Sequence, residues 1–167
     1  RDAFGTKVTV ATTTDGGFVV GMRALPGNPY DGHTLHEALE QVEILTDQRS
    51  DMAFVDRGYR GHGVQTVKVF ISGARRGVTS AIAKLLRRRS AIEPMIGHMK
   101  NNGRLTRCPP TGTTGDALFA VLCGCGHTIR MILRHLKVFL GQFIWLITLF
   151  RAFTQSAGRH QAPQIAA

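Results

Sequence analysis

The sequence predicts a mixed α/β domain with one sheet and flanking helices. Three observations lead to this fold class: two runs rich in β-branched residues around a Gly-rich turn, two further short apolar runs, and long segments with helical apolar spacing. They occur in the order strand, strand, helix, strand, strand, helix, helix, which is typical of a mixed α/β chain. The 167 residues, 43% of them apolar, are enough to bury one core.

Four segments are expected to form strands. Residues 7–13 and 18–25 are rich in β-branched residues, and Asp15-Gly-Gly17 between them tolerates the positive φ of a tight turn. These two segments therefore predict an antiparallel hairpin. Residues 52–55 and 67–71 are short apolar runs that predict two buried strands later in the chain.

Three segments are expected to form helices. Thr34-Leu-His-Glu37 has the spacing of a capping box, with Asp31 as a second candidate for the cap, and apolar residues recur at helical spacing until about Thr46. A long helix is expected over residues 79–101, where Asn-Gly stops it, and a further helical region over residues 114–138.

The charge of the chain favours a polyanionic partner. Twenty-one Lys and Arg oppose eleven Asp and Glu, which gives a net charge of +10 and a pI near 10.6. A field of this sign attracts nucleic acid first and an anionic membrane surface second. Three cysteines, Cys108, Cys123 and Cys125, do not make a disulfide framework, so we expect a reducing, intracellular setting. Because the last two lie two residues apart in a helical pattern, we expect buried thiols and no metal cluster there.

The C-terminal part holds an unusually apolar run. Val138–Phe150 contains thirteen residues without a charge, which is shorter than the roughly 20 that a spanning helix needs. We therefore expect a core or interfacial helix over residues 139–153 and no stable membrane insertion. Residues 154–167 are small and polar and are expected to form a disordered tail. Residues 1–138 would then be the main domain.

Charged residues interrupt the apolar face of the helix predicted over residues 79–101. Charges on an inward face are costly unless they are paired or bound to a ligand. An Arg89–Glu93 ion pair at i, i+4 and a functional site are both open interpretations. Pro94 removes one helical hydrogen bond and is expected to bend the helix beside Glu93. The face, which steps by four and three residues, consists of Ile82, Leu86, Arg89, Glu93, Ile96 and Lys100.

Asp56 follows the strand predicted over residues 52–55 and opens a Gly-rich loop over residues 57–63. Strand ends are where ligands bind in open α/β sheets, although an Asp that begins a turn is also common. Taken together, Asp56 and Glu93 suggest a hard-metal site, because Mg²⁺ takes oxygen ligands and keeps several waters. Two such ions about 4 Å apart can activate a water and stabilise the leaving oxygen of a phosphodiester.

Two separated motifs resemble bacterial insertion-sequence DDE transposases. The stretch from Arg87 to Lys100 (RRRSAIEPMIGHMK) is similar to the family motif Y-x2-R-x3-E-x6-K, with Leu86 where the family has tyrosine. The stretch from Ala53 to Gly61 (AFVDRGYRG) resembles the segment with the family's second Asp. Residues 25–34 (LPGNPYDGHT) resemble the stretch before its first helix. The likeness covers about residues 4–138.

The resemblance implies an RNase H-like, integrase-like fold and metal-dependent DNA cleavage and strand transfer at insertion-sequence ends. Asp56 and Glu93 would be the second and third acidic ligands of Mg²⁺ or Mn²⁺. The implied partners are double-stranded DNA and a second copy of the chain, and the implied location is the bacterial cytoplasm at the nucleoid. Residues implied to support the site and contact DNA are Arg89, Lys100, Arg57, Arg60, Arg87 and Arg88.

The family's first Asp lies on a strand before the hairpin, and the chain begins too late to include that strand. The sequence starts at Arg1 without Met, so we expect a piece of a longer protein in which catalysis is lost unless the missing ligand is supplied elsewhere. Two other functions stay open. One is a non-catalytic basic DNA-binding remnant, and the other is a small basic membrane-associated protein.

Overall fold

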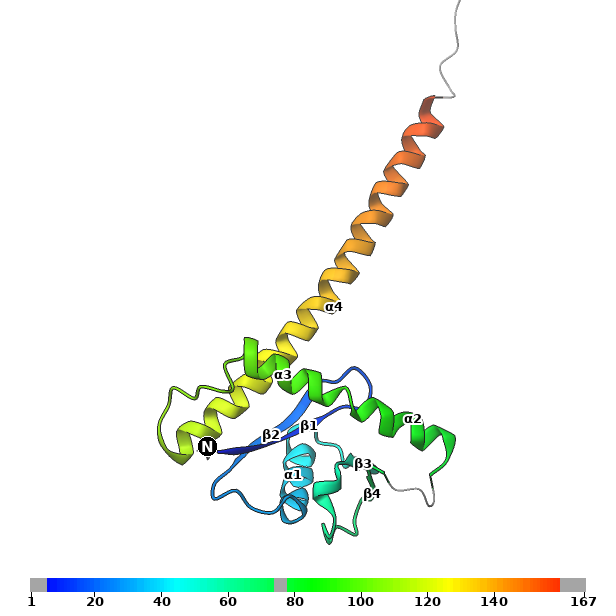
Figure 1. Cartoon of the computed structure of the whole chain (residues 1–167). Helices are drawn as coiled ribbons and strands as arrows, with labels where there is room; N and C mark the ends of the chain where they lie inside the picture. The colour runs from blue at the N-terminus through cyan, green and yellow to red at the C-terminus, as the bar shows by residue number, and fades with distance from the viewer. Residues whose placement is uncertain (1–5, 74–77, 160–167) are drawn as a thin grey trace, which may run out of the picture. The chain divides into compact units, whose positions relative to one another are not determined.

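A computed structural model describes residues 6–73 and 78–159, and it shows a mixed α/β chain with small sheets and helices (Figure 1). By contacts the chain divides into two units, 1–128 and 129–167, each of which we describe by itself. The elements are β1 (Lys7–Thr12), β2 (Val19–Leu25), α1 (Asp31–Thr46), β3 (Met52–Val55), the short 3₁₀ helix η1 (Arg57–Tyr59), β4 (Lys68–Ile71), α2 (Ser80–Arg89), α3 (Ile92–Asn102) and α4 (Gly112–Arg159).

The predicted hairpin is confirmed. β1 and β2 pair antiparallel, with Lys7 opposite Leu25 and Ala11 opposite Gly21. Successive side chains of a strand point to opposite faces, and β2 uses both faces. Met22 packs toward α3 and α4, whereas Arg23 forms an ion pair of 3.1 Å with Glu37 of α1. The hairpin therefore lies between α1 and α3 (Figure 1).

The prediction of one sheet is wrong for the part of the chain that the structure describes. β3 and β4 pair parallel with each other, from Met52 opposite Lys68 to Val55 opposite Ile71, and form a second two-stranded sheet. No backbone ladder joins the two sheets within residues 6–73 and 78–159. Side chains make the contact instead, as in the hydrogen bond between Thr9 of β1 and Tyr59 of η1.

Helix α1 ends at Thr46 as predicted but begins earlier than the capping box implied. Its first residue is Asp31, and Tyr30 at the N-cap makes no side-chain capping bond. The Thr34 hydroxyl lies inside the helix and donates to the Asp31 carbonyl at 2.8 Å. The negative charge of Asp31 in the first turn favours this start, because the N-terminus of a helix carries partial positive charge.

The long helix predicted over residues 79–101 is two helices. The chain leaves the α-helix after Arg89, where Ser90 and Ala91 donate to carbonyls only three residues back, and α3 begins at Ile92. Pro94 lies in the first turn of α3, where a missing N–H costs least. The predicted bend beside Glu93 is therefore present as a break between helices.

Helix α4 extends beyond the region predicted for it. It starts at Gly112, runs through the segment 139–153 and continues to Arg159. Residues 154–159, which we expected in a disordered tail, are helical. The remainder of that predicted tail, 160–167, lies outside the described residues.

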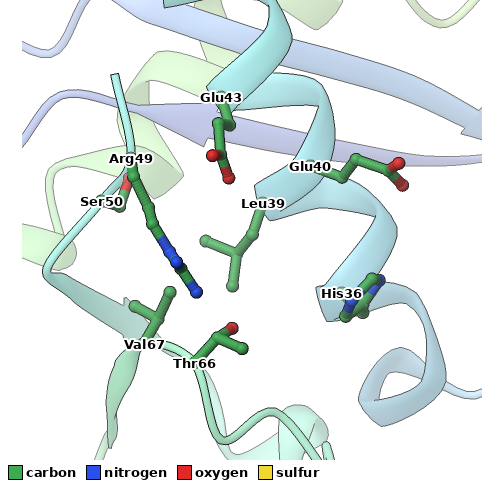
Figure 2. A pocket seen from close by; sticks show the side chains of 8 residues that line it. All are labelled: His36, Leu39, Glu40, Glu43, Arg49, Ser50, Thr66 and Val67. Atoms are coloured by element: carbon green, nitrogen blue, oxygen red, sulfur yellow. The ribbon is translucent and has the colours of Figure 1, made fainter. Parts of the chain in front are cut away.

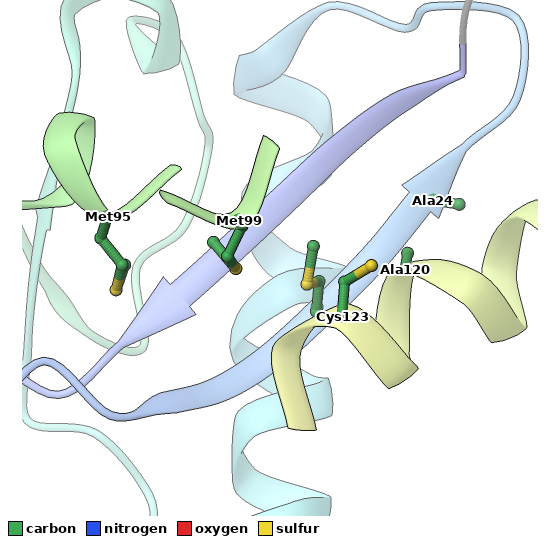
Figure 3. Packing of buried hydrophobic residues seen from close by; sticks show 6 residues of the cluster. Ala24, Met95, Met99, Ala120 and Cys123 are labelled. Carbon is green, nitrogen blue, oxygen red and sulfur yellow. The ribbon is translucent and has the colours of Figure 1, made fainter. Parts of the chain in front are cut away.

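Two buried clusters hold residues 6–128 together. The hairpin cluster joins β2, α3 and the first turns of α4, and its most buried member is Met99, with no exposed surface (Figure 3). The strand-pair cluster joins α1 to β3, β4 and the loop between them. The hairpin cluster comprises Met22, Ala24, Met95, Met99, Ala120 and Cys123, and the strand-pair cluster comprises Leu35, Val55, Val64 and Val67.

The cysteines follow the expectation only in part. Cys123 is buried in the hairpin cluster, and its thiol donates to the Gly103 carbonyl at 3.2 Å. Cys125, expected to be buried as well, is exposed, because residues two positions apart in a helix point to different sides. Cys108 is also exposed.

Candidate functional site

Asp56 lies at the end of β3, where the strand meets η1. It is the N-cap of η1, and its Oδ1 accepts a hydrogen bond from the Arg57 backbone N–H at 2.6 Å. This is the turn-initiating role that Asp favours, because its short side chain reaches the backbone of the next residues. The carboxylate remains 58% exposed, so it is held in orientation and is still open to a ligand.

Arg89 is the partner of Asp56. The Arg89 Nη2 lies 3.3 Å from Asp56 Oδ2, although the two residues are 33 positions apart (89 − 56). The guanidinium is only 14% exposed, at the last residue of α2, which contacts β3. The Arg89–Glu93 ion pair considered from the sequence is therefore not the pair that Arg89 makes in the described structure. The break at Ser90–Ala91 interrupts the helical spacing that such a pair requires.

Glu93 and Lys100 are exposed, so the prediction that they face inward with Ile96 is wrong. The buried residues of α3 are Met95 and Met99, four residues apart on one face. Because the chain leaves the helix before Ile92, the apolar face of α3 is set by its own contacts with the hairpin and does not continue the face of α2. Glu93 is thus an accessible carboxylate in the first turn of α3.

The two carboxylates are the type of ligand that a hard divalent ion prefers, but two are fewer than such an ion needs. Asp56 and Glu93 are accessible carboxylates, and Mg²⁺ prefers such oxygen ligands. Among the described residues no three His, Cys, Asp or Glu side chains form a group able to hold a metal ion. An ion held by these two residues would have to complete its coordination with waters and phosphate oxygens, which is the usual manner for Mg²⁺.

The four other arginines predicted to contact DNA are all exposed and are spread over two places. Arg57 extends along the end of β4, where a Cβ on Gly73 would come within 2.6 Å of its Nη2. The Arg60 carbonyl accepts a hydrogen bond from the Tyr30 hydroxyl at 2.8 Å. Arg87 and Arg88 occupy the last turn of α2 beside Arg89. The Arg88 guanidinium lies 3.5 Å from Asp15 of the hairpin turn, an exposed contact of little energy (Asp15 is 96% exposed).

The structure adds a polar group that the sequence interpretation missed. Lys7 of β1 forms an ion pair of 2.6 Å with Asp31 of α1 and also donates to the Pro29 carbonyl at 2.8 Å. Asp31 in turn packs against Gly58 of η1, where a Cβ would lie 2.6 Å from Asp31 Oδ2. From the sequence, Asp31 is predicted only as a candidate helix cap. Its place in one of the segments with a family resemblance was the available signal.

Tyr59 connects this polar group to Asp56. Burial raises the pKa of the Tyr59 phenol above its usual value of 10.0, and the nearby carboxylates of Asp31 and Asp56 raise it further. A hydrogen bond from Thr9 and the charge of Lys7 act in the opposite direction. Tyr59 is thus partly buried near Asp56, whereas Arg57 of η1 and the following Arg60 are exposed.

A small cavity of 160 Å³ lies elsewhere, between α1 and the start of β4 (Figure 2). It contains none of the predicted site residues. Glu40 and Glu43 line it from one side and Arg49 from the other, so its wall is polar and charged. Its full lining is His36, Leu39, Glu40, Glu43, Arg49, Ser50, Thr66 and Val67.

Comparison with known families supports the resemblance over part of the chain. Residues 1–67 match the Transposase DDE domain family, and this segment includes Lys7, Asp31 and Asp56. Arg89 and Glu93 lie beyond the matched residues. No curated protein and no solved structure matches the chain. The match indicates a transposase-related function for the segment that contains Asp56.

Proposed function

We propose that this chain is a DNA transposase domain of the DDE type, which cleaves DNA strands and transfers them at insertion-sequence ends. The observation that carries the proposal is the ion pair between Arg89 and Asp56. Asp56 belongs to the segment that matches the transposase family, and Arg89 begins the R-x3-E-x6-K motif. The ion pair thus joins two segments that the sequence resemblance identified independently. An RNase H-like arrangement, with a strand that precedes the hairpin, belongs to the same proposal.

The residues of the proposed site have distinct tasks. Asp56 and Glu93 would hold Mg²⁺ or Mn²⁺, which supplies a polarised water and neutralises charge on the scissile phosphate. Arg89 positions Asp56, since its guanidinium contacts Oδ2 while the Arg57 backbone N–H fixes Oδ1. An exposed carboxylate held from both sides keeps its orientation when DNA approaches.

Basic residues outside this centre would bind the DNA backbone. Arg57 and Arg60 on the loop after β3, Arg87 and Arg88 on α2, and Lys100 on α3 are all exposed. Phosphate contacts of this kind orient the duplex without reading its sequence. With the net charge of +10 they favour binding that weakens as salt rises. We further propose that the chain acts as a homodimer on DNA in the bacterial cytoplasm.

Nicking of supercoiled plasmid in the presence of Mg²⁺ or Mn²⁺ tests the proposal. The variants Asp56→Asn and Glu93→Gln should each lower the nicking rate by about 100-fold or more, because each removes a carboxylate that the metal requires. Asp51→Asn and Glu43→Gln are matched controls, since both alter exposed acidic residues of the same type away from the site. They should nick at the rate of the unmodified chain within about twofold. Nicking that survives Asp56→Asn would refute the proposal.

A second function, a non-catalytic DNA-binding domain, is favoured by one observation. The described residues bring no third acidic ligand to Asp56 and Glu93, although the chain carries a charge of +10. This reading predicts binding of duplex DNA in a gel-shift assay without any metal-dependent nicking. Asp56→Asn would then leave the affinity for DNA unchanged or would slightly increase it, because it removes a negative charge.

A further inference from the structure

Residues 129–155, in the C-terminal half of α4, form a helix with a largely apolar surface. Of the side chains from Ile129 to Gln155, all except the partly buried Met131 are exposed. They include the large residues Phe139, Phe143 and Trp145, each more than half exposed. By length and composition the helix would suffice to cross a membrane, and the apolar window is not buried in the fold. Core helices of soluble domains are mostly covered, so a helix with this exposed apolar surface is suited to an external partner.

Five polar residues of this segment and Gly141 form one narrow stripe. They step along the helix by four, three, four, seven and seven residues, which keeps them on one face. The apolar residues fill the rest of the circumference, apart from His135, Gln142 and Thr154, and Arg151 lies at the border of the stripe. The stripe consists of Arg130, Arg134, Lys137, Gly141, Thr148 and Gln155.

The charge of the segment identifies the partner. Asp116 is the last acidic residue of the sequence, so every charged side chain on α4 beyond it is a cation. A second copy of this helix would bring cations toward cations without any carboxylate to pair with them. Duplex DNA would pair with the cations but would leave the broad apolar face in water. An anionic lipid surface satisfies both, because its headgroups meet the cations and its acyl chains meet the apolar face.

We propose that residues 129–155 form an amphipathic helix that adsorbs to anionic membranes, with the helix axis in the plane of the interface. The cations of the stripe face the headgroups, and Phe143 and its apolar neighbours enter the acyl boundary. The charge-free run Val138–Phe150 is about 20 Å long at 1.5 Å per residue, shorter than the roughly 30 Å hydrocarbon core. The polar face continues through this run at Gly141 and Thr148, between the cations at 130–137 on one side and Arg151 on the other.

Trp145 provides a direct assay, because it is the single tryptophan of the chain and is 64% exposed. The full chain, diluted from detergent, is mixed with vesicles of phosphatidylcholine containing about 30% phosphatidylglycerol, a typical anionic surface. Its fluorescence should shift to the blue and the protein should float with the vesicles. Pure phosphatidylcholine vesicles should bind it far more weakly. Lipids brominated near the headgroup should quench Trp145 more than lipids brominated near the bilayer centre.

Two sets of variants separate the electrostatic and apolar contributions. The triple variant Arg130→Gln, Arg134→Gln, Lys137→Gln should bind anionic vesicles roughly 100-fold more weakly, since each basic residue near the surface contributes about fivefold. Phe143→Asn should weaken binding at least about tenfold, because a buried aromatic ring is lost. Thr148→Asn places the same residue on the polar stripe and should change binding by less than about twofold. Circular dichroism on the vesicles verifies that each variant is helical there.

Three outcomes would overturn the inference. The first is equal binding to anionic and zwitterionic vesicles, or no binding to either. The second is a blue shift that follows protein concentration in the absence of lipid, which would assign the surface to a second copy of the chain. The third is stronger quenching of Trp145 from the bilayer centre, which would mean that the helix spans the membrane.

Discussion

The two proposed metal ligands lie in differently built regions of the molecule. Asp56 follows a strand of the strand-pair cluster and is held by the Arg57 backbone and by Arg89. Glu93 lies on α3, which packs through Met95 and Met99 into the hairpin cluster, and its own side chain is exposed. One carboxylate is therefore fixed by polar partners, and the other is placed only by the helix that carries it.

This difference shows how the site depends on both clusters. Arg89 lies just before the break that leads to α3, and its guanidinium contacts Asp56 at the end of β3. It is thus the direct link between the segment that carries Glu93 and the residue that begins the Gly-rich loop. A substitution in the hairpin cluster should move Glu93 and leave Asp56 in place, and one in the strand-pair cluster should do the reverse. Any coupling between the two carboxylates should pass through Arg89.

The largest expected effect comes from the core against which α3 packs. Met99→Ala should lower the free energy of unfolding by about 3 kcal/mol, because Met99 has no exposed surface and its truncation leaves a cavity. Val55→Ala in the strand-pair cluster should cost less, about 2 kcal/mol, since a smaller side-chain volume is removed than in Met99→Ala. Urea unfolding of the full chain in mild detergent, followed by far-ultraviolet circular dichroism, measures both.

Hydrogen exchange then tests whether the two regions respond separately. Met99→Ala should raise the exchange rates of α3 and of the β1–β2 hairpin more than those of β3 and β4. Val55→Ala should show the reverse pattern. Equal increases in exchange rate across both sheets in both variants would mean that the two clusters unfold as one unit and do not differ in local stability.

A smaller effect is expected at the link between the regions. Arg89→Gln should lower the free energy of unfolding by about 1 kcal/mol at low salt, because it removes the ion pair between the mostly buried guanidinium and Asp56. The effect is no larger because the Asp56 carboxylate is more than half exposed to solvent. Arg88→Gln is the matched control one residue earlier. Its partner Asp15 is almost fully exposed, so the change should have no measurable effect. A double-mutant cycle of Arg89→Gln with Asp56→Asn should give a coupling that disappears if the ion pair is not formed in solution.

Local patterns predicted much of the fold. The hairpin, the strand from Met52 to Val55 and the end of α1 at Thr46 all follow from nearby residues, such as the Gly-rich turn at Asp15. The division into two sheets did not follow, because the partner of an edge strand depends on side chains that are far apart in sequence, such as Thr9 and Tyr59.

The site was predicted less completely than the fold. Asp56 was found at its strand end, but the sequence could not show that Arg89 contacts it, since i, i+4 spacing suggested Glu93 as the nearer partner. The orientation of Glu93 was wrong because periodicity assumes one continuous helix, whereas the break before Ile92 gives α3 a new buried face. A helix break of two residues is enough to change which carboxylates face the core.

The smallest expected effect is a pH dependence that belongs to the strand-pair cluster. The raised pKa of Tyr59 means that the folded chain keeps the phenolic proton to a higher pH than the unfolded chain does. Its contribution to stability is therefore complete below pH 10 and is lost as the pH rises through the folded-state pKa. Tyr59→Phe removes this pH-dependent contribution. The variant should have a free energy of unfolding about 1 kcal/mol lower at pH 8, because the hydrogen bond to Thr9 is lost. The difference from the unmodified chain should become progressively smaller above pH 10.

The comparison of the variant with the unmodified chain isolates Tyr59, because all other groups titrate in both. In hydrogen-exchange measurements at increasing alkaline pH, corrected for the intrinsic rate, protection of β3 and β4 in the unmodified chain should fall before that of the hairpin. Tyr59→Phe should abolish this order. If the variant and the unmodified chain lose stability in parallel above pH 10, Tyr59 is not enclosed beside Asp56 in solution, and the polar surroundings assigned to Asp56 are incorrect.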